Sequence, residues 1–373
     1  MFFLRAYNYE DKYIYLKSID EDKDKVIFYN ILRTQHLYNE LDKPTNIYHS
    51  SITLSFLKKK EAYFAFEKET NDLIGMCGLL HYNEQNKSAD IYFLVNDKID
   101  YDKRINLGEK SLNLYLNYLY DNLSINSIIS KTSNNDEVLK YIYNSNMNYL
   151  GTTYLSSNIN DKFYNTIYYQ TTRNDFLKKE KIKEIENTSS GKKLSYSISD
   201  LPIYVPGEKI SLVRPLDVIY KKLDEEKLLL FINNKNTVKL LGGDLTSSKE
   251  FLKDYLFTMD YWIMKNDNLI GYINSFSKDK INRTGNLEYA ILDPKCRNNG
   301  YSKEALSLFK DALFQSKLIY TLNSEVFDFN TISNKVMNSS NMSLVGTRKE
   351  GYFLNGNYRD INIYSTSFIK EKR

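Results

Sequence analysis

The sequence contains the same pattern twice, and this repeat limits the possible folds more than any other feature. Residues 144–152 read NSNMNYLGT and residues 339–347 read SSNMSLVGT, an offset of 195 residues. Residues 72–75 read DLIG and residues 268–271 read NLIG, an offset of 196 residues. This interval is that of a whole domain, because solenoid repeats recur every ~20–50 residues. We therefore expect a duplicated domain.

The limits of the two copies follow from the repeat and from a charged segment between them. The first copy is predicted to span 1–178 and the second 207–373, with a linker over 179–206. Residues 176–186 are rich in charge and favour a helix, which the polar run 187–191 would end. The rest of the linker fits either a flexible connection or an ordered arm.

Both halves show one order of elements: a strand, a helical stretch, two or three strands, a helix, a strand, a second helix and a final hairpin. In the second half the predicted strands are 209–214, 259–265, 269–277, 285–292, 320–326, 343–349 and 359–367, and the predicted helices are 247–257, 301–315 and 330–340. Strands interleaved with helices place each domain in the α/β (α+β) class.

The composition narrows the partners and the compartment. No apolar run approaches the ~20 residues of a membrane-spanning helix, and the N-terminus lacks the basic segment of a signal peptide. The net charge of +4 is small and scattered, which does not favour nucleic acid. Cys77 and Cys296 lie far apart, and the three histidines match no ligand spacing, so we expect no disulfide and no metal. We predict a cytoplasmic protein without membrane or nucleic-acid partners, either a monomer or a dimer.

One segment of the second copy carries recognisable chemistry. A strand-like run over 286–292 leads through a polar loop into a helix whose apolar stripe includes Leu306, Phe309 and Leu313. A helix start presents free backbone N–H groups, which suits a pyrophosphate. Gly300 would let the backbone approach the anion closely. An ordinary strand-to-helix connection is the alternative reading of the same residues.

The surrounding pattern resembles the GNAT superfamily of acetyl-CoA-dependent N-acetyltransferases. Residues 297–302, RNNGYS, look like the Arg/Gln-x-x-Gly-x-Gly/Ala coenzyme A loop of that family, with Ser302 in the last small position. The strand at 269–271 and the helix start at Asn330 also match its landmarks, and the end of the chain resembles the branch that acetylates spermidine and ribosomal-protein N-termini. The resemblance implies a mixed, mostly antiparallel, twisted sheet flanked by helices in each copy.

The resemblance also assigns roles to residues of the second copy. Backbone groups of Ile291, Leu292 and Asp293 would pair with the pantetheine arm of acetyl-CoA, and the Asn330 amide would reach the same arm. Glu288 would act as the general base for the acceptor amine. Where the family often has a tyrosine acid, this chain has Met337. The residues implied in pyrophosphate binding are Arg297, Asn298, Asn299, Gly300, Tyr301 and Ser302.

The first copy has a strand over 88–98 that resembles the cofactor-side strand of the same branch. Its loop is predicted at 103–108, where Asn106 replaces the first glycine of the motif. An asparagine side chain occupies space that a phosphate would need. We expect the first copy to be a GNAT-like domain with a degenerate cofactor loop.

These features predict an N-acetyltransferase that moves an acetyl group from acetyl-CoA to a small-molecule amine or a protein N-terminus. The active site is expected in the second domain. Two alternatives stay open: a tandem GNAT protein that binds acetyl-CoA without turnover, and an acyl or aminoacyl transferase that uses another donor. The identity of the acceptor has no signature in the sequence.

Overall fold

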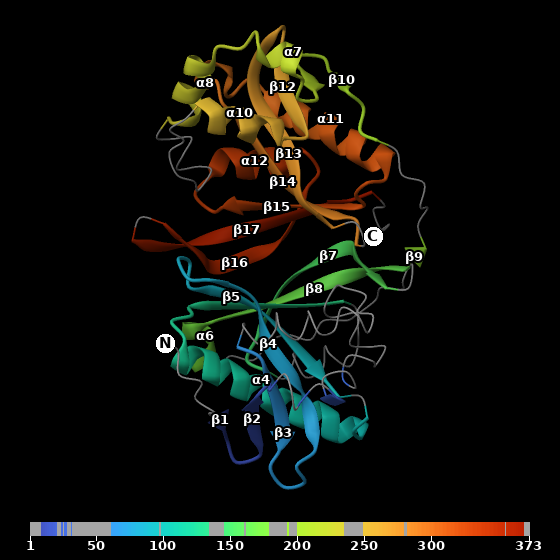
Figure 1. The fold of residues 1–373 in the computed structure, drawn as a ribbon, viewed down its shortest axis with the longest axis vertical. Coiled ribbons are helices and arrows are strands. Elements are labelled where there is room, and N and C mark those ends of the chain that lie inside the picture. Colours follow the sequence, from blue (N-terminus) through green and yellow to red (C-terminus); the bar gives the residue numbers. More distant parts are fainter. Residues whose placement is uncertain are drawn as a thin grey trace. The chain divides into compact units, whose positions relative to one another are not determined.

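A computed structural model gives the fold of the chain and describes residues 9–20, 24, 26–27, 31, 61–96, 98–133, 145–159, 162–178, 192–193, 200–234, 249–279, 282–354 and 356–368. The chain divides into two compact units, each centred on one mixed β-sheet (Figure 1).

The first sheet has the strand order β1-β2-β3-β4-β5-β6-β8-β7, and β9 pairs with β8. Its strands are β1 (Tyr9–Glu10), β2 (Ile14–Ser18), β3 (Tyr63–Glu67), β4 (Leu73–Asn83), β5 (Ser88–Val95), β6 (Ser127–Ser133), β7 (Asn148–Ile159), β8 (Lys162–Thr172) and β9 (Lys192–Lys193). The described helices of this unit include α4 (Tyr101–Asn122) and α6 (Arg173–Lys178). Only β5 and β6 among the pairs with a defined register run parallel.

The second sheet has the order β10-β11-β12-β13-β14-β15-β17-β16. Its strands are β10 (Tyr204–Pro206), β11 (Ser211–Val213), β12 (Tyr261–Lys265), β13 (Asn268–Asp279), β14 (Thr284–Ile291), β15 (Thr321–Phe327), β16 (Ser343–Leu354) and β17 (Asn357–Ser367). Its described helices include α7 (Asp217–Tyr220), α8 (Glu225–Ile232), α10 (Lys249–Phe257), α11 (Tyr301–Ser316) and α12 (Thr331–Ser339), with a short 3₁₀ turn η1 (Pro294–Cys296). The single parallel pair with a defined register is β14 with β15.

The two sheets share one topology, which confirms the tandem duplication. In both, five antiparallel strands are followed by the parallel partner of the fifth, and the second strand of the final hairpin lies between that partner and the first strand of the hairpin. The repeat also holds at single positions: Gly75 pairs with β3 and Gly271 with β12, each at a register shift. A Cβ added to Gly75 would collide with the Leu94 carbonyl oxygen, and one added to Gly271 with the Ala290 carbonyl oxygen.

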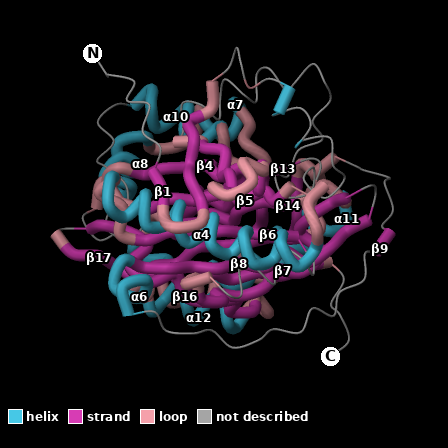
Figure 2. Tube along the Cα trace, turned by 90° about the horizontal axis from the view of Figure 1, so that it is seen from below, coloured by secondary structure: helices cyan, strands magenta, loops and turns pink. Residues whose placement is uncertain are grey.

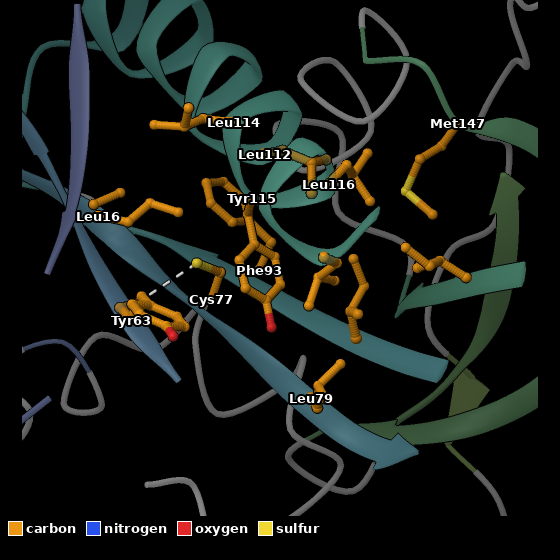
Figure 3. Close-up of a cluster of buried hydrophobic side chains, with 14 of the residues drawn as sticks. Leu16, Tyr63, Cys77, Leu79, Phe93, Leu112, Leu114, Tyr115, Leu116 and Met147 are labelled. Carbon is orange, nitrogen blue, oxygen red and sulfur yellow. Dashed lines mark hydrogen bonds between the residues drawn. The ribbon is translucent and has the colours of Figure 1, made fainter. Parts of the chain in front are cut away.

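Each sheet has apolar side chains on both faces, so each unit has two cores. In the first unit, α4 packs on β2, β4 and β5 (Figure 2). This core contains Leu16, Cys77, Phe93 and Tyr115, and the Cys77 thiol contacts the Tyr63 carbonyl (Figure 3). In the second unit, α11 and α12 contribute to one core, and α8 and α10 contribute to the core on the opposite face.

The observed elements confirm the predicted α/β class and most of the predicted order. Every strand and helix predicted in the second half overlaps an observed one, while α7, α8 and β10 were not predicted. Of the helix predicted over 176–186, only the start lies in α6, and the rest, with the run 187–191, falls outside the described residues. The domain limits at 178 and 207 stay predictions.

Candidate functional site

The parallel strands β14 and β15 pair at one end and separate toward the other. Their register runs from Thr284↔Thr321 to Asn286↔Asn323 and then stops. β14 continues along β13 as far as Ile291. Over this second half, the edge of β14 that faces away from β13 has no strand partner among the described residues. The sheet therefore opens into a fork.

Backbone groups of β14 point into this fork. The backbone N–H of Leu292 donates to the Ile270 carbonyl across β13, at 2.8 Å. Because antiparallel pairing alternates along a strand, the backbone groups of Tyr289 and Ile291 point to the other side, into the fork. At its base, Oδ1 of Asn323 is buried and has no hydrogen-bond partner among the described residues. A buried acceptor without a donor costs about 1–3 kcal/mol, which a ligand or a water would relieve.

The loop that leaves β14 is bent by two residues in left-handed conformations. Asp293 caps η1 by accepting from the Lys295 N–H at 2.9 Å. Asn298 then has φ 61° and Gly300 has φ 81°. A Cβ added to Gly300 would meet nothing within 4 Å. The loop therefore has an open side, and left-handed residues of this kind form concavities that bind anions.

The N-terminus of α11 lies at the end of this loop without a capping side chain. Gly300 is its N-cap residue and makes no side-chain hydrogen bond. The side chain of Tyr301 is buried in the core below, so this residue offers the loop only its backbone N–H. Ser302 is half-buried in the first turn. Free N–H groups at the positive end of a helix of 16 residues are suited to an anion.

Arg297 ties the loop to the end of β14. Its Nε donates to the Ile291 carbonyl at 3.1 Å, and its Nη2 donates to the Leu292 carbonyl at 3.4 Å. Partial burial lowers the pKa of its guanidinium, and the Asp293 carboxylate opposes this shift. Asn299 supports the turn, because its Nδ2 donates to the Arg297 carbonyl at 2.9 Å. These contacts fix the loop before any ligand arrives.

Glu288 projects from β14 toward α10, on the sheet face opposite α11. Its Oε1 accepts from the Tyr255 hydroxyl at 2.8 Å and from the Tyr272 hydroxyl at 2.9 Å. The two hydroxyl oxygens lie 2.7 Å apart. Burial, with a contribution from Glu288, raises the pKa of both hydroxyls well above the usual range. Both tyrosines therefore stay protonated near neutral pH and act as donors.

Comparison with known families identifies this part of the chain. The sequence model described as "Acetyltransferase (GNAT) domain" matches residues 222–343, which include the fork, the loop and Glu288. Residues 222–343 form a GNAT acetyltransferase domain. The chain thus contains an acyltransferase domain, and none of the curated protein sequences compared with it matches.

Several solved structures of GNAT proteins match part of this chain. A GNAT acetyltransferase from Bacillus anthracis has 16% identity and a TM-score of 0.38, covering 44% of this chain and 98% of its own. RimL, a ribosomal L7/L12 alpha-N-protein acetyltransferase in complex with coenzyme A, has 18% identity and a TM-score of 0.40, with coverages of 44% and 97%. Spermidine N-acetyltransferase from Vibrio cholerae, with CoA and spermine, has 16% identity and a TM-score of 0.38, with coverages of 43% and 95%.

Two further residues of the GNAT domain lie on α12. Asn330 is its N-cap, and its Oδ1 accepts from the Ser333 N–H at 3.1 Å, which leaves Nδ2 as the group that can donate. Met337 is fully buried in the core between α11, α12 and the sheet. A hydroxyl at this position would have to enter that core.

Tyr255 and Tyr272 were not predicted from the sequence as partners of Glu288. Tyr272 lies on the neighbouring strand, and Tyr255 lies on a helix 33 residues before Glu288. The alternation of β13 and β14 places Tyr272 on the same face as Glu288, which is a weak signal. The sequence contains no comparable signal for Tyr255.

The first unit has no counterpart of this carboxylate. The shared register places Tyr92 where the GNAT domain has Glu288, since Tyr92 pairs with Gly78 and Glu288 pairs with Asn274. Tyr92 is buried, and its hydroxyl has no hydrogen-bond partner among the described residues. Likewise Met76, which is fully buried, takes the place of Tyr272.

The cofactor loop of the first unit differs from its predicted form. Residues 103–108 were predicted to form a degenerate cofactor loop, but the structure places them in the first turns of α4. The helix begins earlier because the Asp100 carboxylate caps it, accepting from the N–H groups of Asp102 and Lys103 at 3.1 and 3.3 Å. Four residues, 97–100, separate Asn96 from α4, whereas eight residues, 293–300, separate the equivalent Leu292 from α11. The prediction of a loop at 103–108 was therefore wrong.

The described residues contain neither a metal site nor a membrane-spanning helix. No group of three or more His, Cys, Asp or Glu residues in that part of the chain is placed to hold a metal ion. No helix there is long and apolar enough to cross a membrane.

Proposed function

We propose that the second unit transfers an acetyl group from acetyl-CoA to a primary amine. The proposal rests on one observation: a single loop connects the open fork to the uncapped N-terminus of α11. Eight residues of this loop, 293–300, separate the two features. A fork with free strand edges suits an extended pantetheine arm, which hydrogen-bonds as a further strand would. The N–H groups at the start of α11 suit its pyrophosphate.

The residues present fit this cofactor. Arg297, Asn298, Asn299, Gly300, Tyr301 and Ser302 would surround the pyrophosphate, chiefly through backbone N–H groups. Asn330 would donate from Nδ2 to the pantetheine arm. Of the predicted residues Ile291, Leu292 and Asp293, the first directs its backbone N–H into the fork, and its carbonyl already accepts from Arg297. The N–H groups of the other two donate to Ile270. We therefore add the backbone of Tyr289 to the pantetheine contacts.

The chemistry that acetyl-CoA supplies is a thioester carbonyl open to attack by an amine. Glu288 would accept the proton of the amine, because its carboxylate lies on the strand that borders the fork. Backbone N–H groups of the fork would stabilise negative charge on the carbonyl oxygen. The acceptor is a small-molecule amine or a protein N-terminus.

Calorimetric titration with acetyl-CoA tests the cofactor site. Gly300→Glu places a carboxylate in the open side of the loop, and we expect at least a 30-fold loss of affinity, about 2 kcal/mol. Gly356→Glu is the matched control, because Gly356 also has φ 81° and no atom within 4 Å of an added Cβ. This control should bind normally. Absence of binding by the wild type, or equal affinity of Gly300→Glu, would overturn the proposal.

Release of free thiol tests the transfer itself. We expect it with at least one of four classes of acceptor: polyamines, aminoglycosides, amino acids and N-terminal peptides. The buried Met337 favours a second candidate, a protein that binds acetyl-CoA without turnover. Tight cofactor binding with no thiol release across all four classes would favour that candidate. Transfer only from a donor other than acetyl-CoA would favour the aminoacyl or acyl alternative.

A further inference from the structure

Two tyrosine hydroxyls contact one oxygen of the Glu288 carboxylate. Glu288 Oε1 and the hydroxyl oxygens of Tyr255 and Tyr272 lie 2.7–2.9 Å from one another. Each hydroxyl carries one proton and can donate it in a hydrogen bond to the ionised carboxylate. Two donated hydrogen bonds favour the ionised form and fix the position of the carboxylate.

Glu288 lacks a cation. It is half-buried, and within the part of the chain that the structure describes no Lys, Arg or His forms an ion pair with it. A partly buried carboxylate usually has a cationic partner, because burial without one is unfavourable. The aromatic rings of Tyr255 and Tyr272 meet edge to face at 5.5 Å beside it. Tyrosine rings and a carboxylate together suit an alkylammonium group.

The duplication shows that the fold does not require this cluster. The first unit builds the same sheet with Tyr92 in place of Glu288 and Met76 in place of Tyr272, and both side chains are buried. A polar cluster that the scaffold can replace by apolar packing is not explained by folding. Its retention in the GNAT domain indicates a role in chemistry.

We propose that Tyr255 and Tyr272 hold the carboxylate of Glu288 in position, and that the acceptor is a cationic amine whose ammonium group pairs with Glu288. The two tyrosines are positioning residues, since they act through the carboxylate. This inference rests on the proposed function and adds to it the charge of the substrate and two further residues of the site.

One ammonium proton moves to the carboxylate of Glu288, which leaves a neutral amine with a lone pair. That lone pair forms the C–N bond to the acetyl carbonyl carbon, and the C–S bond breaks with its electron pair on sulfur. The proton that nitrogen loses on becoming an amide joins the thiolate, and Glu288 returns its proton to solvent.

Tyrosine-to-phenylalanine variants test the positioning role. With an acceptor that supports transfer, we expect Tyr255→Phe and Tyr272→Phe each to lower kcat about 10-fold, and Glu288→Gln to lower it at least 100-fold. The affinity for acetyl-CoA should change less than twofold in all three. Tyr261→Phe is the matched control, because its buried hydroxyl donates to the Pro202 carbonyl at 2.7 Å on the other face of the sheet. It should keep the wild-type kcat.

Chemical rescue separates positioning from general stability. Added formate should restore at least a tenth of the wild-type rate to Glu288→Ala, and it should fail to do so when Tyr255→Phe is also present. A purely structural role of Tyr255 would leave the rescue intact. Effects of Tyr255→Phe and Tyr272→Phe no larger than that of Tyr261→Phe would overturn the inference while the acetyltransferase proposal stands.

Direct binding tests the charge of the acceptor without turnover. n-Hexylamine and 1-hexanol have the same shape and differ in charge, so we expect wild-type protein to bind the amine at least 10-fold more tightly, as measured by titration followed by NMR. Glu288→Gln should remove this difference. Equal binding of amine and alcohol by the wild type contradicts the inference. Because this measurement needs no acetyl-CoA, it gives a result even if the proposed transfer fails.

Discussion

At the scale of single residues, Gly75 and Gly271 show how the sheet keeps its shape. Each lies beside a carbonyl oxygen of the next strand, of Leu94 in the first unit and of Ala290 in the second, and leaves no room for a Cβ. We expect Gly75→Ala and Gly271→Ala each to destabilise its unit by about 1–3 kcal/mol, because the strands would have to separate. Urea unfolding followed by circular dichroism measures this cost.

The same pair of variants distinguishes the two units by function. Ala290 lies on β14, the strand that borders the fork, so Gly271→Ala should also weaken acetyl-CoA binding several-fold. Gly75→Ala should leave that binding unchanged at a similar cost in stability. If both variants weakened binding equally, the fork of the second unit would not be the cofactor site.

At the scale of elements, α4 and α11 are the equivalent long helices of the two units, since α4 follows β5 and α11 follows β14. The two helices begin differently. Asp100 caps α4 with its carboxylate, whereas Gly300 leaves the start of α11 open. We expect Asp100→Ala to lower the melting temperature of the first unit, with a cost of about 0.5–2 kcal/mol. Asp102→Ala, in the first turn but without a capping bond, should cost less. Equal effects of the two variants would show that capping does not define this helix start.

The same elements show what the sequence could predict and what it could not. α11 was predicted within one residue of its observed limits, because Leu306, Phe309 and Leu313 repeat at helical spacing and a glycine precedes them. The start of α4 was missed because the capping bonds of Asp100 outweighed the resemblance of 103–108 to a loop. Glu288 was identified on its strand, but its contact with α10 depends on tertiary packing that no local pattern encodes.

At the scale of the whole molecule, the duplication predicts how many cofactor molecules bind. The first unit has a connection four residues shorter before its helix, and the Asp100 carboxylate occupies the N–H groups that a phosphate would need. Lys103, the nearest cation in the first turn, already pairs with Glu67 at 2.6 Å and Asp72 at 2.8 Å. An anion at this helix start would meet a carboxylate instead of free donors.

We therefore expect one acetyl-CoA per chain, although the chain carries two copies of the fold. Isothermal titration of the full chain should give a stoichiometry near one, and Gly300→Glu should remove the whole binding isotherm. A stoichiometry of two, or a residual isotherm in Gly300→Glu, would place a working site in the first unit. Adding Asp100→Ala to Gly300→Glu then decides whether the capping carboxylate alone blocks that site. Because the four missing residues also remove the left-handed turn, we expect this double variant to stay unable to bind acetyl-CoA.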